Sequence, residues 1–354
     1  MITPITHILP YTVVQRRRLL PREGRVGVRQ GQTVRATDVI ATTVLKPSHT
    51  MLDVAAGLGV RRSAAPQFIE RYEGDKLETG DVIARKTGLF NRVVRSPISG
   101  RIVLMTDGYV MIEEKQAPYE LMAGIPGEVT ELVHELGAVI ETTGALIQGA
   151  WGNGVIDFGV LNVMSENPGD ELKPGQIDVG LRGAVLMAGT CLSPEVFQRA
   201  ADQRLRGLIL GSMPSEFIPT ARRLPFPLIL TEGFGRLPMN AAAFRLLSTS
   251  QKRDIAINAE AFDPETGSRP EILIPLPPSD AEAVSDVGRL DTGQRVQVMR
   301  APHKGAWGVV EALLPGRTLF PNGLRLPSAQ VRLEGGESIR VPTANLEIIN
   351  SAKE

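Results

Sequence analysis

Two loops in the middle of the chain carry polar side chains at positions where a ligand could bind. Residues 208–210 and 228–230 are short apolar runs that predict buried strands, and a glycine-rich loop follows each of them. Ligands of open parallel sheets bind beyond the carboxyl ends of the strands, so these loops predict a small-ligand or enzyme site. Alternatively, Gly211, Gly233 and Gly235 only turn the chain. The candidate ligand-binding residues are Ser212, Thr231, Glu232 and Arg236.

The residue types that most catalytic and metal chemistry needs are scarce. The chain has one cysteine, Cys191, and four histidines without the spacing of metal ligands, so we expect no disulfide, metal, cofactor or catalytic residue. Cys191 precedes a predicted helix start, where a thiol pKa is lowered, but no histidine between residues 135 and 302 could act as its base. A packed cysteine is therefore favoured.

The position of these residues depends on an alternation of strands and helices between residues 179 and 275. Apolar runs predict strands at 183–187, 208–210, 228–230 and 255–261, with helices at 193–204, 215–223 and 240–247 between them. Such alternation predicts a small parallel α/β domain. The segment 207–228 resembles the swivelling phosphohistidine domains of phosphoenolpyruvate-using enzymes, but it contains no histidine, so the resemblance implies no transfer chemistry.

A short motif recurs four times in the first half of the chain. Segments 31–41 and 74–84 align without gaps, and the same frame returns at 137–147 and 169–177. Each copy has a turn glycine, an apolar residue three positions later, a second turn residue and an apolar pair. This pattern predicts a tight hairpin that leads into a short strand. The irregular intervals argue against a solenoid and favour duplicated parts of one compact β fold.

Segment 73–84, followed by Ser96-Pro97-Ile98-Ser99-Gly100, resembles the biotinyl/lipoyl domains and their wider relatives, the barrel-sandwich hybrids. The resemblance implies a barrel-sandwich hybrid fold for residues 1–178. Carriers of this kind modify a lysine at a hairpin tip. Here Lys86 is the only lysine nearby and neither flank matches the modified motifs. The resemblance therefore supports a fold and not a cofactor.

The last part of the chain resembles the KOW motif of SH3-like barrels, which occurs in ribosomal proteins and transcription elongation factors. The residues that carry the resemblance are 293–298 and Pro302-His303-Lys304-Gly305-Ala306-Trp307-Gly308-Val309. It implies an SH3-like barrel at 288–354 that contacts RNA, the ribosome, RNA polymerase or another protein. A proline-rich break at 276–287 indicates a linker. The candidate nucleic-acid or partner contacts are Arg295, Arg300, His303, Lys304, Trp307 and Arg325.

The net charge is zero, but the charges are segregated along the chain. Residues 1–106 carry 17 basic and 8 acidic groups, whereas residues 107–178 carry 2 and 13. The two segments could neutralise each other within one β region, or they could form a docking surface with one basic and one acidic side. The basic run Arg16-Arg17-Arg18 could contact a nucleic acid.

The sequence thus predicts a multidomain, mainly β protein with an α/β middle. One cysteine, no apolar run of membrane-spanning length and no signal peptide favour a cytoplasmic protein without membrane insertion. We expect a non-enzymatic scaffold that docks a protein partner. RNA binding through the C-terminal module is the second interpretation, and a ligand sensor or enzyme is the third.

Overall fold

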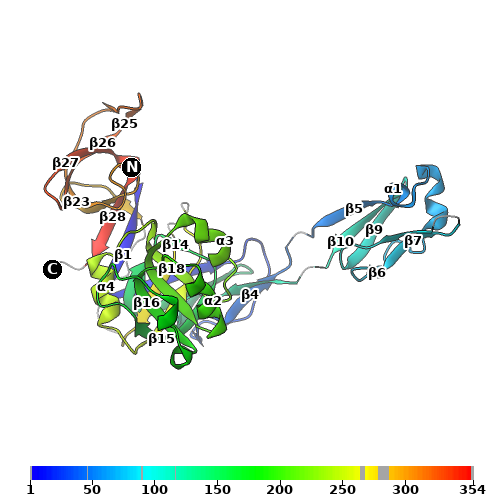
Figure 1. Cartoon of the computed structure of the whole chain (residues 1–354), viewed down its shortest axis with the longest axis horizontal. Helices are drawn as coiled ribbons and strands as arrows, with labels where there is room; N and C mark the ends of the chain where they lie inside the picture. The colour runs from blue at the N-terminus through cyan, green and yellow to red at the C-terminus, as the bar shows by residue number, and fades with distance from the viewer. Residues whose placement is uncertain are drawn as a thin grey trace. The chain divides into compact units, whose positions relative to one another are not determined.

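The computed structural model describes residues 2–45, 47–88, 91–115, 117–263, 268–277 and 287–351. The protein is mainly β and contains a large mixed sheet (Figure 1). Contacts divide the chain into a main unit (residues 1–19, 27–40 and 122–354) and an inserted unit (residues 20–26 and 41–121). The predicted segments 1–178, 179–275 and 288–354 follow changes in sequence pattern and stay predictions. Residues 278–286 of the predicted linker lie outside the described residues.

Four parallel strands form the middle of the large sheet, in the order β15–β16–β17–β18. Successive residues of β16 point to opposite faces, and both faces are buried: Leu186 packs in one core cluster and Met187 in another. Helices α2 and α3 cover the first face, and α4 covers the second. The bounds are β15 (Ile156–Val163), β16 (Ala184–Thr190), α2 (Glu195–Asp202), β17 (Gly207–Met213), α3 (Ile218–Ala221), β18 (Leu228–Phe234) and α4 (Ala241–Ser248).

The next strand differs from the parallel arrangement that the alternation predicted. Strand β19 (Asp254–Asn258) pairs antiparallel with β15 and with β20 (Glu271–Pro275), and β20 pairs antiparallel with β13 (Gly137–Gln148). The connection from β18 to β19 spans residues 235–253 and contains α4, so its length permits either direction, and the direction of β19 is set by its pairing with β15 and β20. The α/β segment is therefore continuous with the antiparallel strands in one mixed sheet.

Strand β1 (Ile2–Leu19) joins distant parts of the main unit. It pairs antiparallel with β13 from Ile8 to Leu19, parallel with β28 (Leu346–Ser351) and antiparallel with β21 (Val287–Arg289). Its edges are thus satisfied by segments more than 100 residues away in the chain, so the main unit depends on long-range pairing.

The C-terminal strands form an antiparallel series around their own apolar cluster. Strand β22 pairs with both β23 and β28, and β23 leads through β26 to β27. Val296, Val310 and Val331 are buried in that cluster, as the period of two in each strand requires. The bounds are β22 (Arg295–Val298), β23 (Trp307–Leu313), β24 (Thr318–Leu319), β25 (Arg325–Leu326), β26 (Ser328–Leu333) and β27 (Ser338–Pro342).

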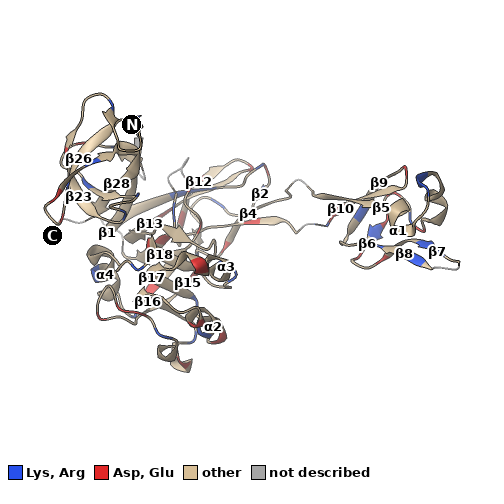
Figure 2. Ribbon diagram, turned by 45° about the horizontal axis from the view of Figure 1, so that its top comes forward, with Lys and Arg blue, Asp and Glu red and all other residues tan. Residues whose placement is uncertain are grey.

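The inserted unit has a four-stranded sheet of order β5–β10–β9–β6 and a β7–β8 hairpin. Helix α1 (Val54–Leu58) begins at Asp53, whose carboxylate accepts a hydrogen bond from the Ala56 amide. Lysines and arginines lie along β6, β7 and β8 (Figure 2). The bounds are β2 (Arg25–Val26), β4 (Val39–Thr43), β5 (His49–Asp53), β6 (Lys76–Leu77), β7 (Val82–Lys86), β8 (Arg92–Arg95), β9 (Gly100–Thr106), β10 (Tyr109–Glu114) and β11 (Tyr119–Met122).

The first two copies of the sequence motif form the same local structure, one in each unit. The turn glycines have φ values of 81° at Gly31 and 94° at Gly74. Their amides donate at 2.8 Å to the carbonyls of Val129 and Ile102, respectively. A two-residue strand follows each glycine, β3 (Thr33–Val34) and β6, and pairs with β12 (Gly127–Val133) and β9. The glycine turn and the short strand after it are as predicted, but the two strands of each copy do not pair with each other, because β4 pairs with β2 and β11 and β7 pairs with β8. The predicted hairpin is therefore wrong for both copies.

The other two copies do not repeat this turn and two-residue strand. Residues 137–147 lie inside the continuous strand β13, where Gly144 serves a close approach: a Cβ there would meet the Ile274 carbonyl oxygen at 2.3 Å. Residues 169–177 keep the turn but pair only through one parallel bridge, from Glu171 to Thr190. Residues 137–147 form a continuous strand because they pair with β1 along their length, and a turn there would leave backbone groups of β1 without partners.

Three arginines of the main unit are held by carboxylates that come from far along the chain. Arg16 pairs with Glu271 at 2.7 Å, and Arg18 pairs with Glu260. Arg269, which is 5% exposed, donates to Glu347 at 2.6 Å. Arg16 and Arg18, from the basic run noted in the sequence, therefore form internal ion pairs, with acids outside the acidic block 107–178. Among the described residues, no helix is long and apolar enough to cross a membrane.

We expect Glu347→Ala to lower the free energy of unfolding of the main unit by about 3–5 kcal/mol, because it leaves the buried Arg269 guanidinium without its counter-ion. Glu311→Ala, which breaks the exposed pair with Arg332, should cost under about 1 kcal/mol. Denaturant titration followed by tryptophan fluorescence measures both, since Trp151 and Trp307 lie in the main unit. Equal losses in the two variants would contradict the burial argument.

The Arg18–Glu260 pair predicts a pH dependence. Burial raises the pKa of Glu260, but the hydrogen bonds and charge of Arg18 outweigh it, and the pKa is lowered overall. The folded pKa then lies below the unfolded value of about 4.3, so the stabilisation is present above that pH and is lost as pH falls through the folded pKa. The stability difference between the wild type and Glu260→Gln should therefore shrink in urea titrations as pH falls from about 6 to about 3. A constant difference would refute this.

Candidate functional site

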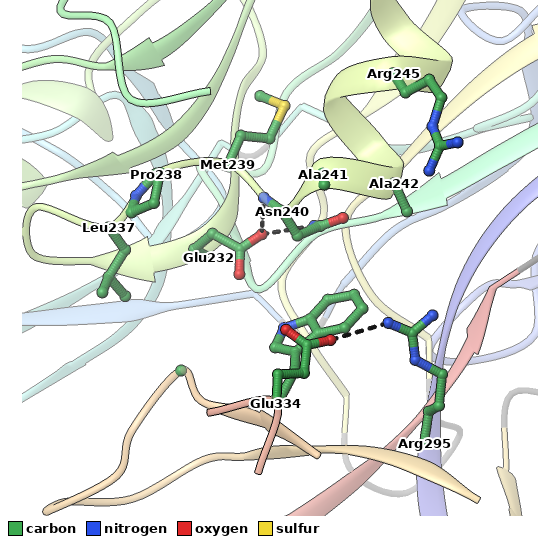
Figure 3. A pocket seen from close by; sticks show the side chains of 12 residues that line it. Glu232, Leu237, Pro238, Met239, Asn240, Ala241, Ala242, Arg245, Arg295 and Glu334 are labelled. Carbon is green, nitrogen blue, oxygen red and sulfur yellow. Dashed lines mark hydrogen bonds and ion pairs between the residues drawn. The ribbon is translucent and has the colours of Figure 1, made fainter. Parts of the chain in front are cut away.

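Glu232, in β18, lines two pockets of the main unit. The first, here called the α4 pocket, has a volume of about 510 Å³ and lies at the start of α4 (Figure 3). The second, here called the aromatic pocket, has a volume of about 360 Å³. Both pockets have walls from the α/β strands and from the C-terminal strands. The α4 pocket is lined by Glu232, Leu237, Pro238, Met239, Asn240, Ala241, Ala242, Arg245, Arg295, Gly305, Trp307 and Glu334. The aromatic pocket is lined by Pro4, Ala150, Trp151, Glu232, Gly233, Phe234, Phe262, Met299, Arg300, Lys304, Ala344, Leu346 and Glu347.

The Glu232 carboxylate connects three parts of this region. Its Oε1 accepts hydrogen bonds from the backbone amide of Asn240 at 3.0 Å and from the Asn240 side chain at 2.6 Å. Its Oε2 accepts from Gln297 Nε2 of β22 at 3.2 Å. Asn240 is in turn the N-cap of α4 and accepts from the Ala243 amide. Glu232 thus fixes the start of α4 and ties it to the C-terminal strands.

Arg295 and Glu334 lie on the opposite wall of the α4 pocket from Glu232 (Figure 3). Arg295 Nη2 donates to Glu334 Oε1 at 3.1 Å, and its guanidinium lies 5.2 Å from the ring centroid of Trp307. Trp307 is half-buried and packs against the core cluster of α4. The pocket therefore offers polar groups of both signs beside one aromatic ring.

The aromatic pocket has a different chemistry. Trp151 and Phe234 make an edge-to-face contact with ring centroids 5.5 Å apart, and Phe262 is 40% exposed. Trp151 reaches this place because β14 (Trp151–Gly152) pairs antiparallel with β18, opposite Leu230. Gly233, with φ of 88°, turns β18 just before Phe234. Two exposed cations, Arg300 and Lys304, complete the lining.

Only Glu232 among the four α/β candidates lines either pocket. Ser212 is fully buried, and its hydroxyl bonds both the carbonyl and the amide of Leu237, at 2.7 and 2.8 Å. Thr231 is 8% exposed and donates to the Leu210 carbonyl. Ser212 and Thr231 hold the loops in place, and Arg236 is exposed outside both linings.

The C-terminal candidates divide between the two pockets. Arg295 and Trp307 line the α4 pocket, whereas Arg300 and Lys304 line the aromatic pocket. His303 is half-buried and lies outside both linings, as does Arg325, which is exposed on β25.

Several lining residues were not predicted from the sequence. Asn240 could have been found as a helix N-cap, and Trp151 stands in the glycine-rich run 149–154, which indicates only a turn. Glu334 and Phe262 of the linings, and Gln297, which donates to Glu232, carry no sequence signal of their own, because they enter the site only through the packing of distant strands.

The described residues include the groups on which metal and thiol chemistry would depend. Their histidines, cysteine and carboxylates form no cluster of three that could hold a metal ion. Cys191 is fully buried, and its thiol donates to the Ser193 carbonyl at 3.3 Å. Burial raises the pKa of the Cys191 thiol to about 12, so the thiolate is suppressed at neutral pH.

No protein-family model matches the chain, and no curated protein shows significant similarity to it.

We expect Cys191 to be unreactive toward a thiol reagent such as 5,5′-dithiobis(2-nitrobenzoate) at pH 8 in the folded protein, because the thiol is both protonated and buried. One thiol per chain should react after unfolding in guanidinium chloride, which is the internal control. Stoichiometric labelling of the native protein within minutes would contradict this assignment.

Proposed function

We propose that this protein is a non-catalytic ligand-binding protein whose site is the pair of pockets that share Glu232. The observation that carries the proposal is the convergence of two sets of candidates from separate parts of the sequence. Glu232 comes from the α/β loops, while Arg295, Trp307, Arg300 and Lys304 come from the C-terminal strands. Concave sites with a few polar groups and aromatic walls are typical of small-ligand binding.

We also propose that the C-terminal strands and the N-terminal part of the chain belong to the two fold families that the sequence resembles. The antiparallel order β28–β22–β23–β26–β27 of the C-terminal strands supports an SH3-like barrel of the KOW type. The matching turns at Gly31 and Gly74 support relatedness to the barrel-sandwich hybrids. We propose that the chain contains these two fold types and that the two pockets carry its function.

A scaffold that docks a protein partner is the second candidate function, favoured by the outer face of the inserted unit's sheet. Met51, Met111 and Leu104 lie in register across β5, β10 and β9, and Met51 and Leu104 are 61% and 44% exposed. An exposed apolar row of this kind is a feature of interaction surfaces.

RNA contact through the C-terminal strands is less well supported. Arg295 and Arg332 form ion pairs with Glu334 and Glu311, which lowers their capacity to neutralise phosphates. Arg300, Lys304 and Arg325 are exposed and keep this alternative open.

Plugging each pocket tests the proposed function. Ala241 and Ala344 are exposed small residues that line the α4 pocket and the aromatic pocket, respectively, so tryptophan at either position fills one pocket without disturbing the core. In a thermal-shift screen of metabolites, a ligand at a hundred times its Kd should stabilise the wild type by about 2.7 kcal/mol.

One plugged variant should lose this stabilisation, and Ala56→Trp, an exposed position on α1 of the inserted unit, should keep it. A screen in which no ligand raises the Tm, or in which both plugged variants respond like the wild type, would refute the proposal.

A further inference from the structure

The aromatic pocket combines exposed ring surface with uncompensated positive charge. Trp151, Phe234 and Phe262 come from three separate segments, and Met299 adds a polarisable thioether. Monomeric proteins normally bury aromatic rings in the core, so three rings lining one cavity of about 360 Å³ form a surface suited to a planar ligand.

The charges that line this pocket differ in their availability. The carboxylate of Glu347 is held by Arg269, and that of Glu232 is held by Asn240 and Gln297. The two basic side chains are exposed, and within the described part of the chain neither Arg300 nor Lys304 forms an ion pair or a side-chain hydrogen bond. The charge available to a ligand is therefore positive, because the acids are already engaged.

We propose that the aromatic pocket binds a nucleotide, with its base against the aromatic side chains and its phosphate between Arg300 and Lys304. This inference rests on the proposed function and deepens it by naming the ligand class. Base stacking on aromatic side chains is tolerant of base identity, and a phosphate accepts charge-assisted hydrogen bonds from arginine and lysine. The volume of the cavity is within the range of small-molecule sites.

The nucleotide could be free or could belong to a single RNA strand, since both offer the same base and phosphate. Titration with the four ribonucleoside 5′-monophosphates and with a ten-nucleotide oligouridylate separates these sources. Tighter binding of the monophosphates indicates a free nucleotide, whereas tighter binding of the oligonucleotide indicates a strand. The proposal is supported by either result, provided that the same residues are required.

The test uses the full chain with Trp307→Phe, which leaves Trp151 as the only tryptophan and as the fluorescent reporter of the pocket. We expect a monophosphate to quench Trp151, with no response to ribose 5-phosphate, which lacks the base, or to adenosine, which lacks the phosphate. Arg300→Ala and Lys304→Ala should each weaken binding about tenfold, and Phe234→Leu should weaken it by a similar factor. Arg223→Ala removes an exposed positive charge outside the pocket lining and should leave binding unchanged.

Isothermal titration calorimetry of the plugged variants, in the chain with both native tryptophans, locates the site without relying on fluorescence. Ala344→Trp should abolish nucleotide binding, and Ala241→Trp should retain it. Loss of binding only with Ala241→Trp would overturn the inference and leave the proposed function standing at the α4 pocket. The inference also fails, and the proposed function stands, if nucleotides do not bind while another ligand class stabilises the protein in a pocket-dependent way. If no ligand of any class binds, both proposals fail.

Discussion

An 18-residue strand cannot remain stable unless its backbone groups are satisfied along its edges, and β1 meets this requirement with partners taken from the whole length of the main unit. Its antiparallel pairing with β13 and its parallel pairing with β28 bring the first and last strands together. Because β28 also pairs with β22, the C-terminal strands are held beside the α/β strands by the same ladder. Both pockets exist only because of this juxtaposition.

Charge reinforces that ladder where β1 passes the antiparallel strands. Arg16 and Arg18 alternate along the strand with the exposed Arg17, so the two side chains lie on one face and meet Glu271 and Glu260. Removing one partner of such a pair leaves a charge without its counter-ion, which lowers the free energy of unfolding where the charge is shielded from water. Arg16 and Arg18 of the basic run therefore have a structural role, in ion pairs with acids more than 200 residues away in the chain.

Glu232 has a similar structural role inside the candidate site. A carboxylate that accepts two hydrogen bonds from Asn240 and a third from Gln297 has little remaining capacity for a ligand, but it holds α4 and β22 in register. The pockets on its two sides then differ in chemistry because different strands complete them. Arg295 and Glu334 neutralise each other in one, whereas Arg300 and Lys304 leave the other positive.

Local signals in the sequence determined the elements. The apolar runs of the α/β strands and the turn glycines Gly31 and Gly74 produced the strands and turns expected of them, because each depends on local side-chain pattern and φ angles. The sequence also indicated Glu232, Trp307 and Lys304 as candidate binding residues. It could not show that Ser212 and Thr231 are buried, since burial depends on what packs above a loop.

Only the tertiary structure decided the direction of β19, the continuous strand at Gly137 and the meeting of Glu232 with the C-terminal side chains. Each of these depends on which distant edge is available for pairing, and pairing partners leave no trace in local spacing. The physical reason is that the backbone groups of β1 are satisfied by β13 and β28, each more than 100 residues away in the chain.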